Sequence, residues 1–261
     1  RFVLHKQHLA NESAAASRRL VAVVKDICGL HAQIASTPYL SLFNRIKDFQ
    51  KDDLTRSLYE KRILVKIWGM RATVHIVATE QVTEYFQATK LAGGRHPLKL
   101  EPIHNKILKL LAAKGPLTAQ ELAGHIPHLA KRVKTPYGDM STGALKLREL
   151  TQSTILVPVQ PKGDWKSSLH TYASFKTWLP HVDLQALSET DARNKVISHY
   201  LAGFGPATAE DIAWWMGISK GAVTQALEEM RRHAEQIEIA GLDGKFVILK
   251  PDLDALRRFS S

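Results

Sequence analysis

The sequence predicts a mainly helical α+β protein built from three tandem winged-helix segments. The first observation is a repeat: the stretch 115–119, Gly-Pro-Leu-Thr-Ala, returns 90 residues later at 205–209 as Gly-Pro-Ala-Thr-Ala. The second is that each copy lies between stretches whose apolar residues recur at helical spacing. The third is that each copy is followed by two β-like runs joined by a turn. Helices followed by a terminal hairpin indicate a winged helix, and we place the three segments at residues 1–100, 101–180 and 181–261.

Local signals mark where the helices of the two repeats begin and end. In each repeat the first helix is expected to end at the Gly-Pro pair, because proline cannot continue a helix. Thr118 and Thr208 are expected to cap the second helix. Each stands three residues before an acid, Glu121 or Asp211, which is the spacing of a capping box.

The third helix and the hairpin follow in the same order in both repeats. Serine is a favoured N-cap, and Ser141 and Ser219 each precede a stretch with helical apolar spacing. The expected third helices are 142–152 and 220–232, and the expected strands are 154–160 with 165–172 and 237–240 with 245–249.

The first hundred residues fit a looser third copy, which rests on element order alone. A glycine ends its first helix, and a Thr-Pro pair opens the second, with proline at a favoured first-turn position. The expected elements are helices over 17–28, from 37 onward, over 51–61 and over 80–91, a hairpin over 63–77, and a glycine-containing link over 93–97.

Positive charge is concentrated in the first two segments. The chain has 261 residues and a formal net charge of +11. Residues 1–100 carry +8 and residues 101–180 carry +6, whereas residues 181–261 carry −3. A basic region joined to a mildly acidic one favours a polyanion, above all nucleic acid, as the partner. Composition alone leaves open an ordinary lysine-rich, solvated surface.

Composition also excludes several classes of protein. The single cysteine, Cys28, excludes an intrachain disulfide and a cysteine-rich zinc site. The histidines show no metal-ligand spacing, and there is no glycine-rich phosphate loop. No apolar run approaches the ~18 to 20 residues needed to cross a bilayer, and the amino-terminal residues lack a signal-peptide core. We expect a monomeric, cytoplasmic, nucleoid-associated protein without membrane, metal or cofactor; since the chain begins at Arg1, we also expect a trimmed fragment.

The stretch 71–76, Arg-Ala-Thr-Val-His-Ile, is a candidate for DNA contact. Strand alternation is expected to place Arg71, Thr73 and His75 on one face of a hairpin and the apolar residues on the other. Such a cationic face can meet phosphate or enter a minor groove. An ordinary solvated hairpin face explains the same pattern. The further candidates for DNA contact on this hairpin are Lys66, Trp68 and Met70.

His31 and Gln33 are the candidates for catalysis. They lie in a short stretch between Gly29 and the Ser-Thr-Pro cluster at 36–38, which favours an extended backbone with both side chains on one side. A neutral imidazole and an amide on one wall can together hold and orient a water molecule. A buried His and Gln that satisfy each other structurally would give the same pattern.

Taken together, three motifs resemble the AlkZ-like (YcaQ-like) winged-helix DNA glycosylases. They are Gly-Leu-His-Ala-Gln at 29–33, Trp-Gly-Met-Arg-Ala-Thr-Val-His at 68–75, and the repeated Gly-Pro-x-Thr-Ala. The resemblance implies tandem winged helices followed by a carboxy-terminal β-barrel, and excision of alkylated bases, including crosslinked ones. The family's Gln-x-Asp or Gln-x-Gln catalytic signature maps onto 31–33, and its Arg-x-Thr-x-His hairpin maps onto 71–75.

Two departures from this family pattern affect the expected chemistry. His31 replaces the first Gln, and no carboxylate occupies position 33, so a strong general base is missing. A cationic base such as N7-alkylguanine is already a good leaving group, and it needs a positioned water more than a strong base. The family's β-barrel is also expected to be absent, since only two residues follow Phe259.

The function expected from these observations is a monofunctional DNA glycosylase. It would bind duplex DNA and hydrolyse the N-glycosidic bond of alkylated, cationic purines or crosslinked bases near His31 and Gln33. The first alternative is a non-enzymatic tandem winged-helix DNA-binding protein or regulator that reads the major groove with the third helix of a repeat. The second is protein–protein scaffolding by the acidic last segment.

Overall fold

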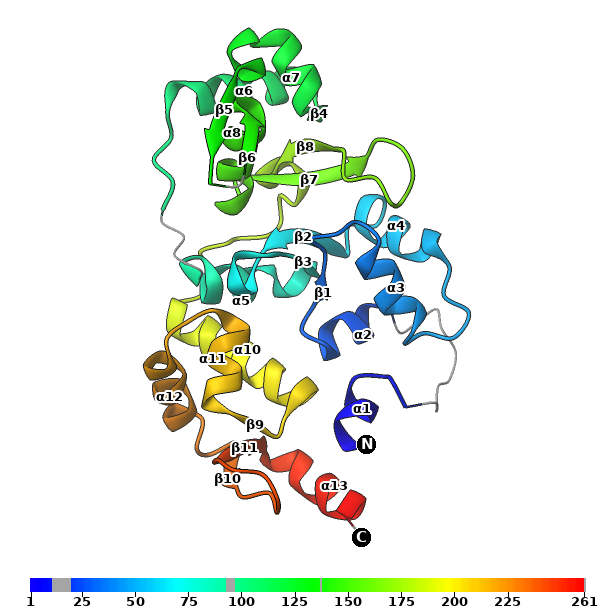
Figure 1. Cartoon of the computed structure of the whole chain (residues 1–261), viewed down its shortest axis with the longest axis vertical. Helices are drawn as coiled ribbons and strands as arrows, with labels where there is room; N and C mark the ends of the chain where they lie inside the picture. The colour runs from blue at the N-terminus through cyan, green and yellow to red at the C-terminus, as the bar shows by residue number, and fades with distance from the viewer. Residues whose placement is uncertain (11–19, 93–96, 137, 261) are drawn as a thin grey trace.

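Figure 1 shows three segments in a row, with the first segment (blue to cyan) between the second (green) and the third (yellow to red). The computed structural model describes residues 1–10, 20–92, 97–136 and 138–260. Helices and small antiparallel sheets make up these residues, which confirms the predicted α+β class. None of the helices in these four ranges has the length and apolar character needed to cross a membrane.

All three segments have the same order of elements: a helix, a two-residue strand, two helices and two strands. In the first segment these are α2 (Leu20–Asp26), β1 (Leu30–His31), α3 (Thr37–Phe43), α4 (Lys51–Tyr59), β2 (Leu64–Trp68) and β3 (Val74–Ala78). In the second they are α6 (Pro102–Lys114), β4 (Leu117–Thr118), α7 (Ala119–His125), α8 (Thr142–Gln152), β7 (Leu156–Pro161) and β8 (His170–Ser174). In the third they are α10 (Glu189–Phe204), β9 (Ala207–Thr208), α11 (Ala209–Met216), α12 (Lys220–Glu229), β10 (Ala234–Ile237) and β11 (Phe246–Leu249).

The three sheets also share one strand order. The two-residue strand of each segment pairs antiparallel with the last strand, which gives β1-β3-β2, β4-β8-β7 and β9-β11-β10. The first segment, predicted as a third copy from its element order alone, therefore also has the strand pairing of the two repeats.

The predicted helix caps are present in both repeats. Thr118 Oγ1 accepts the backbone N–H of Glu121 at 3.1 Å, and the Glu121 carboxylate accepts the backbone N–H of Thr118 at 2.7 Å. Thr208 and Asp211 form the same capping box. Ser141 and Ser219 cap α8 and α12 with their side chains. These contacts confirm the helix starts that were read from local spacing.

Some elements were not predicted, and some boundaries differ. The unpredicted elements include α1 (Phe2–Lys6), the hairpin of β5 (Arg132–Thr135) and β6 (Gly138–Ser141), α9 (Phe175–Trp178) and α13 (Lys250–Ser260). The strand expected at 237–240 lies three residues earlier, because Ala234 is buried and pairs with Leu249 of β11. The ring of Trp165, which was expected in a strand, packs against Tyr39 before β8 begins. Residues 17–19 of the first expected helix and most of the link at 93–97 lie outside the described residues.

The first segment's sheet is covered on both faces. Leu64 and Ile76 point into a core formed mainly by the first segment. Val65, Ile67 and Val77 point the other way, into a core shared with the third segment. Strands buried on both faces read as continuous apolar runs, as Leu-Val-Lys-Ile-Trp and Val-His-Ile-Val-Ala do. The polar residues Lys66 and His75 interrupt those runs.

Helix α10 fastens the third segment to the first. It lies against α5 (Val82–Thr89), where Glu84 accepts hydrogen bonds from His199 at 2.8 Å and Lys195 at 3.1 Å. Gly203 of α10 lies so close to the backbone oxygen of Asp26 that a Cβ atom would overlap it. Helices α10 and α2 can approach this closely because glycine has no side chain.

Candidate functional site

β1 ends between the two predicted catalytic residues. His31 pairs directly with His75 of β3, and the two rings meet edge to face with centroids 5.5 Å apart. Gln33 lies beyond the strand, where its Oε1 accepts the backbone N–H of Val74 at 3.3 Å. This bond orients the carboxamide and leaves its Nε2 hydrogens available as donors. Both predicted side chains are exposed, and each has its own partner on β3.

A cleft of about 560 Å³ separates the first segment's hairpin from the second segment. Gln33, Lys66, Trp68 and Thr73 line it from the first segment. His31 is not among the lining residues, so the structure does not bring His31 and Gln33 together on this cleft as expected. Side chains of the second segment form the opposite wall, among them Leu147, Arg148, Thr151, His170 and Tyr172.

The tip of the hairpin differs from the expected strand. Arg71 and Ala72 form a tight turn with φ of 54° and 52°, and β3 begins only at Val74. The alternation that placed Arg71 on one face with Thr73 and His75 is therefore wrong at Arg71. The Arg71 guanidinium lies 4.0 Å from the ring centroid of Trp214 on α11. The hairpin tip thus contacts the third segment.

Three of the predicted DNA contacts, Lys66, Met70 and His75, are buried, and the last two do not line the cleft. Met70 is 1% exposed and packs in the core shared by the first and third segments. His75 is 7% exposed, and its Nδ1–H donates to the backbone oxygen of Thr73 at 3.1 Å. Burial lowers the pKa of His75 to about 4, against the opposing effect of that hydrogen bond, and the nearby His31 lowers the pKa further. As they lie, Met70 offers DNA no surface and His75 carries no charge at neutral pH.

Trp68 joins the two walls of the cleft. Its Nε1–H donates to Thr151 Oγ1 at 3.2 Å, and the Arg148 guanidinium lies 5.5 Å from its ring centroid. Thr73 Oγ1 donates to the backbone oxygen of Met70 at 3.0 Å at the hairpin end of the cleft. Aromatic rings and cations in one groove are the combination that binds nucleic acid bases and phosphates.

Two ionisable groups in this cleft are held in an unusual environment. Lys66 is 8% exposed, and burial lowers its pKa to about 8. Burial also lowers the pKa of His170 to about 4, and the charge of Lys66 lowers that pKa further. Perturbed groups of this kind cluster at functional sites.

The second segment's contribution could not be read from the sequence. Arg148, Thr151 and His170 follow the hairpin by more than seventy residues, and no local motif links them to it. The packing of α8 and β7 against β2 brings them to the same cleft. Sequence spacing carries no signal for such a contact.

One described trio, Glu101, His104 and Glu149, has ligand atoms within 4.8 Å of one another. Its geometry is that of a hydrogen-bonded structural cluster. His104 Nδ1 accepts the backbone N–H of Glu101 at 3.0 Å, and its Nε2–H donates to Glu149 at 2.8 Å. Lys146 lies 3.0 Å from both carboxylates. With both ring nitrogens engaged and an ammonium beside the acids, this trio does not fit a metal ion.

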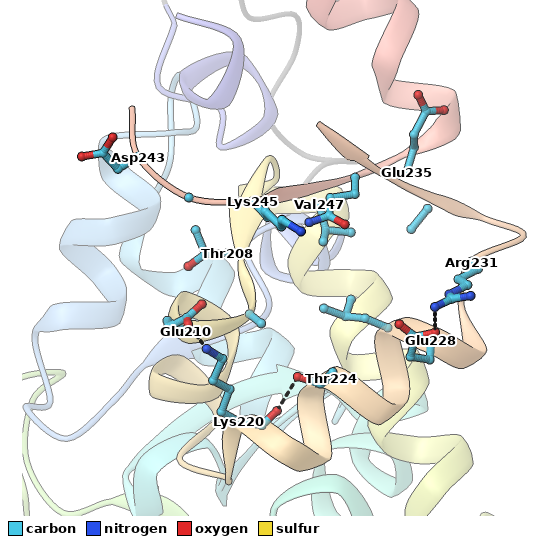
Figure 2. Close-up of a pocket in the computed structure, with 15 residues that line it drawn as sticks. Thr208, Glu210, Lys220, Thr224, Glu228, Arg231, Glu235, Asp243, Lys245 and Val247 are labelled. Atoms are coloured by element: carbon cyan, nitrogen blue, oxygen red, sulfur yellow. Dashed lines mark hydrogen bonds and ion pairs between the residues drawn. The ribbon is translucent and has the colours of Figure 1, made fainter. Parts of the chain in front are cut away.

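A second hollow, of about 730 Å³, lies in the third segment between α11, α12 and the β10–β11 strands. Figure 2 shows that Lys220 pairs with Glu210 and Arg231 with Glu228 around it. Four acids line it against three cations, which are Lys220, Arg231 and Lys245. This hollow lacks the excess positive charge that a polyanion favours.

Comparison with known proteins places this geometry in a family. The model of the AlkZ-like DNA glycosylase family matches residues 24–258. The solved structure of the Streptomyces sahachiroi DNA glycosylase AlkZ is similar, with a TM-score of 0.74 and 19% identity over 98% of this chain and 70% of that chain. No curated protein matches the sequence. Since the family match spans nearly the whole chain, this protein belongs to the AlkZ-like DNA glycosylase family.

Proposed function

We propose that this protein hydrolyses the N-glycosidic bond of alkylated, cationic purines, or of crosslinked bases, in duplex DNA. The observation that carries the proposal is Gln33, whose carboxamide is oriented by Val74 at the mouth of a cleft that also holds Lys66, Trp68 and Arg148. The match to a family of DNA glycosylases supports the reaction class.

The residues present favour a positively charged leaving group. Position 33 has an amide and position 31 an imidazole, so neither can act as the strong carboxylate base that a neutral base requires. An N7- or N3-alkylated purine is positively charged and leaves as a neutral base. This lowers the barrier to breaking the N-glycosidic bond before the protein contributes. Water positioned by Gln33 Nε2 in the cleft then supplies the remaining catalysis, and the exposed His31, which does not line the cleft, serves as the proton acceptor.

The fold gives less support to a sequence-reading regulator. A major-groove reader needs the exposed face of a third helix. In α8, Ala144, Leu147, Arg148 and Thr151 line the cleft toward the first segment. At α12, Lys220 pairs with Glu210, and Arg231, just beyond the helix, pairs with Glu228.

The test is release of base from a duplex oligonucleotide that carries a single N7-methylguanine. We expect the wild-type protein to produce abasic sites, and His31→Ala and Gln33→Ala to lose that activity while keeping DNA affinity. A matched duplex with a neutral damaged base, 1,N6-ethenoadenine, should remain intact. The control variant is Gln120→Ala, at the corresponding position after β4.

Two results would contradict the proposal. Full rates of base release in both variants would remove His31 and Gln33 from the reaction. A strong preference for one undamaged sequence, with no base release from any alkylated duplex, would instead favour the regulator.

A further inference from the structure

Lys66 is a group in the cleft that hydrolysis of the N-glycosidic bond does not use. We propose that its amine attacks the C1′ aldehyde of an abasic site, which gives the protein a DNA strand-cleaving lyase activity beyond base removal. The inference rests on the proposed function, because an abasic site is the product of base excision.

The placement of Lys66 supports a chemical role. It lies at the middle of β2, opposite Ile76 of β3, in a sheet buried on both faces. Its side chain is 8% exposed and lines the cleft, and its ammonium makes no hydrogen bond or ion pair within the described part of the chain. A lysine is rarely buried without a partner. The cost of holding it there is accounted for if a substrate is its partner.

The environment also favours the nucleophilic form. An amine attacks a carbonyl carbon only when it is unprotonated, and desolvation is the usual means of achieving this near neutral pH. Burial lowers the pKa of Lys66 to about 8. About a tenth of the amine is then neutral at pH 7, and about half at pH 8.

His170 supplies a second ionisable group in the same cleft. It lies on β8 in the opposite wall of the cleft, close enough for the charge of Lys66 to lower its pKa. Its Nδ1 is buried and has no hydrogen-bond partner in the described part of the chain. A neutral imidazole with an open nitrogen is a proton acceptor.

The proposed reaction balances without an oxidant or reductant. The neutral Lys66 nitrogen forms a bond to C1′ of the ring-opened sugar, and the carbonyl oxygen leaves as water, with one proton from the amine and one from solvent, to give a protonated imine. His170 accepts the C2′ proton, the C2′–C3′ double bond forms, and the C3′–O bond breaks with its electron pair on the leaving phosphate. Water then hydrolyses the imine, which releases an unsaturated aldehyde on one strand end and regenerates Lys66.

The experiment uses the full chain and a duplex with one preformed abasic site, so it does not depend on base excision. Sodium cyanoborohydride reduces an imine and traps the covalent complex, and peptide mass spectrometry locates the attached lysine. We expect the adduct on Lys66. Lys66→Met should lower both trapping and strand cleavage at least 100-fold, whereas the matched Lys61→Met, an exposed lysine just before β2, should not. His170→Ala should slow strand cleavage but still be trapped.

The outcomes separate this inference from the proposed function. An adduct mapped to another amine, or no adduct at all, would overturn the role of Lys66 even if the protein releases N7-methylguanine. Trapping at Lys66 in a protein that releases no base would uphold the lyase and reject the glycosylase. Met is unbranched and apolar and suits a buried strand position; a cooperative urea-unfolding transition like that of the wild-type protein would show that Lys66→Met is folded.

Discussion

The two-residue strand serves different purposes in the first segment and in the two repeats. In the repeats it ends at Thr118 or Thr208, and each threonine caps the helix that follows at once. In the first segment it ends at His31, but α3 begins only at Thr37, after a Ser36 N-cap that makes no side-chain hydrogen bond. His31 is exposed as a result.

The shared strand pairing reveals a sequence relation that the repeat search did not detect. Leu-His-Ala-Gln at 30–33 corresponds to Leu-Thr-Ala-Gln at 117–120 when β1 and β4 are matched. The residue at the end of this strand therefore either caps the next helix, as Thr118 and Thr208 do, or is left available to bind a ligand, as His31 is. Where the polar residue closes a helix its hydrogen bonds are used, and where the helix is displaced they are available to a ligand.

The largest effect is expected when His31 is replaced by threonine, the residue at the matching position of both repeats. We expect His31→Thr to lower base release by about 100-fold or more, the range for loss of a proton-transfer or water-positioning group. Stability should be unchanged, because no helix begins at Ala32 for the new threonine to cap. Rates would be measured on the N7-methylguanine duplex and stability by urea unfolding. Wild-type activity in His31→Thr would mean that His31 has no catalytic role.

The histidine opposite His31 should behave as a structural residue. Because burial lowers the pKa of His75 to about 4, the unfolded chain, with a histidine pKa of about 6.5, takes up this proton first. The contribution of His75 to the free energy of unfolding is then at its full value above about pH 6.5. It decreases as the pH falls, by on the order of 3 kcal/mol at pH 4. Urea unfolding at several pH values should show a smaller acid loss in His75→Gln. An identical pH dependence would show that His75 does not carry the effect.

In the two repeats, substituting the residue at the end of the two-residue strand should lower the free energy of unfolding, whereas in the first segment it should not. Thr118→Ala and Thr208→Ala each remove a cap and should cost about 1 kcal/mol. The matched control is Ser36→Ala, which should change stability by less than about 0.5 kcal/mol, since Ser36 makes no capping hydrogen bond. Equal losses in all three variants, measured by urea unfolding, would erase the distinction between the segments.

The smallest expected effect concerns the hairpin tip. Arg71→Ala should weaken DNA binding and reduce the slope of log affinity against log salt by about 1, the loss of one phosphate contact. Removing its stacking on Trp214 should cost about 0.5–1 kcal/mol of stability. Arg62→Ala is the matched control, because Arg62 also stacks on a tryptophan, 3.8 Å from the Trp178 ring centroid, but lies before β2 and not at the hairpin tip. An unchanged salt slope in Arg71→Ala would remove the hairpin tip from the DNA interface.

Local sequence signals determined the parts of the fold that depend on neighbouring residues. Gly-Pro pairs, the threonine and serine caps and the apolar spacing located the helices of both repeats, because each signal acts within one or two turns of backbone. The motif at 29–33 and the hairpin at 68–75 also indicate the family from the sequence alone.

Tertiary structure alone decided which side chains meet. Alternation predicted that Arg71 would lie with Thr73 and His75, but packing against the end of α11 turned the backbone at Arg71. The cleft that joins Gln33 and Lys66 to His170 depends on the packing of β7 against β2, which no spacing rule describes. Periodicity says that a strand has two faces, whereas burial of both faces, and hence the environment of Lys66 and His75, follows only from what the other segments place against them.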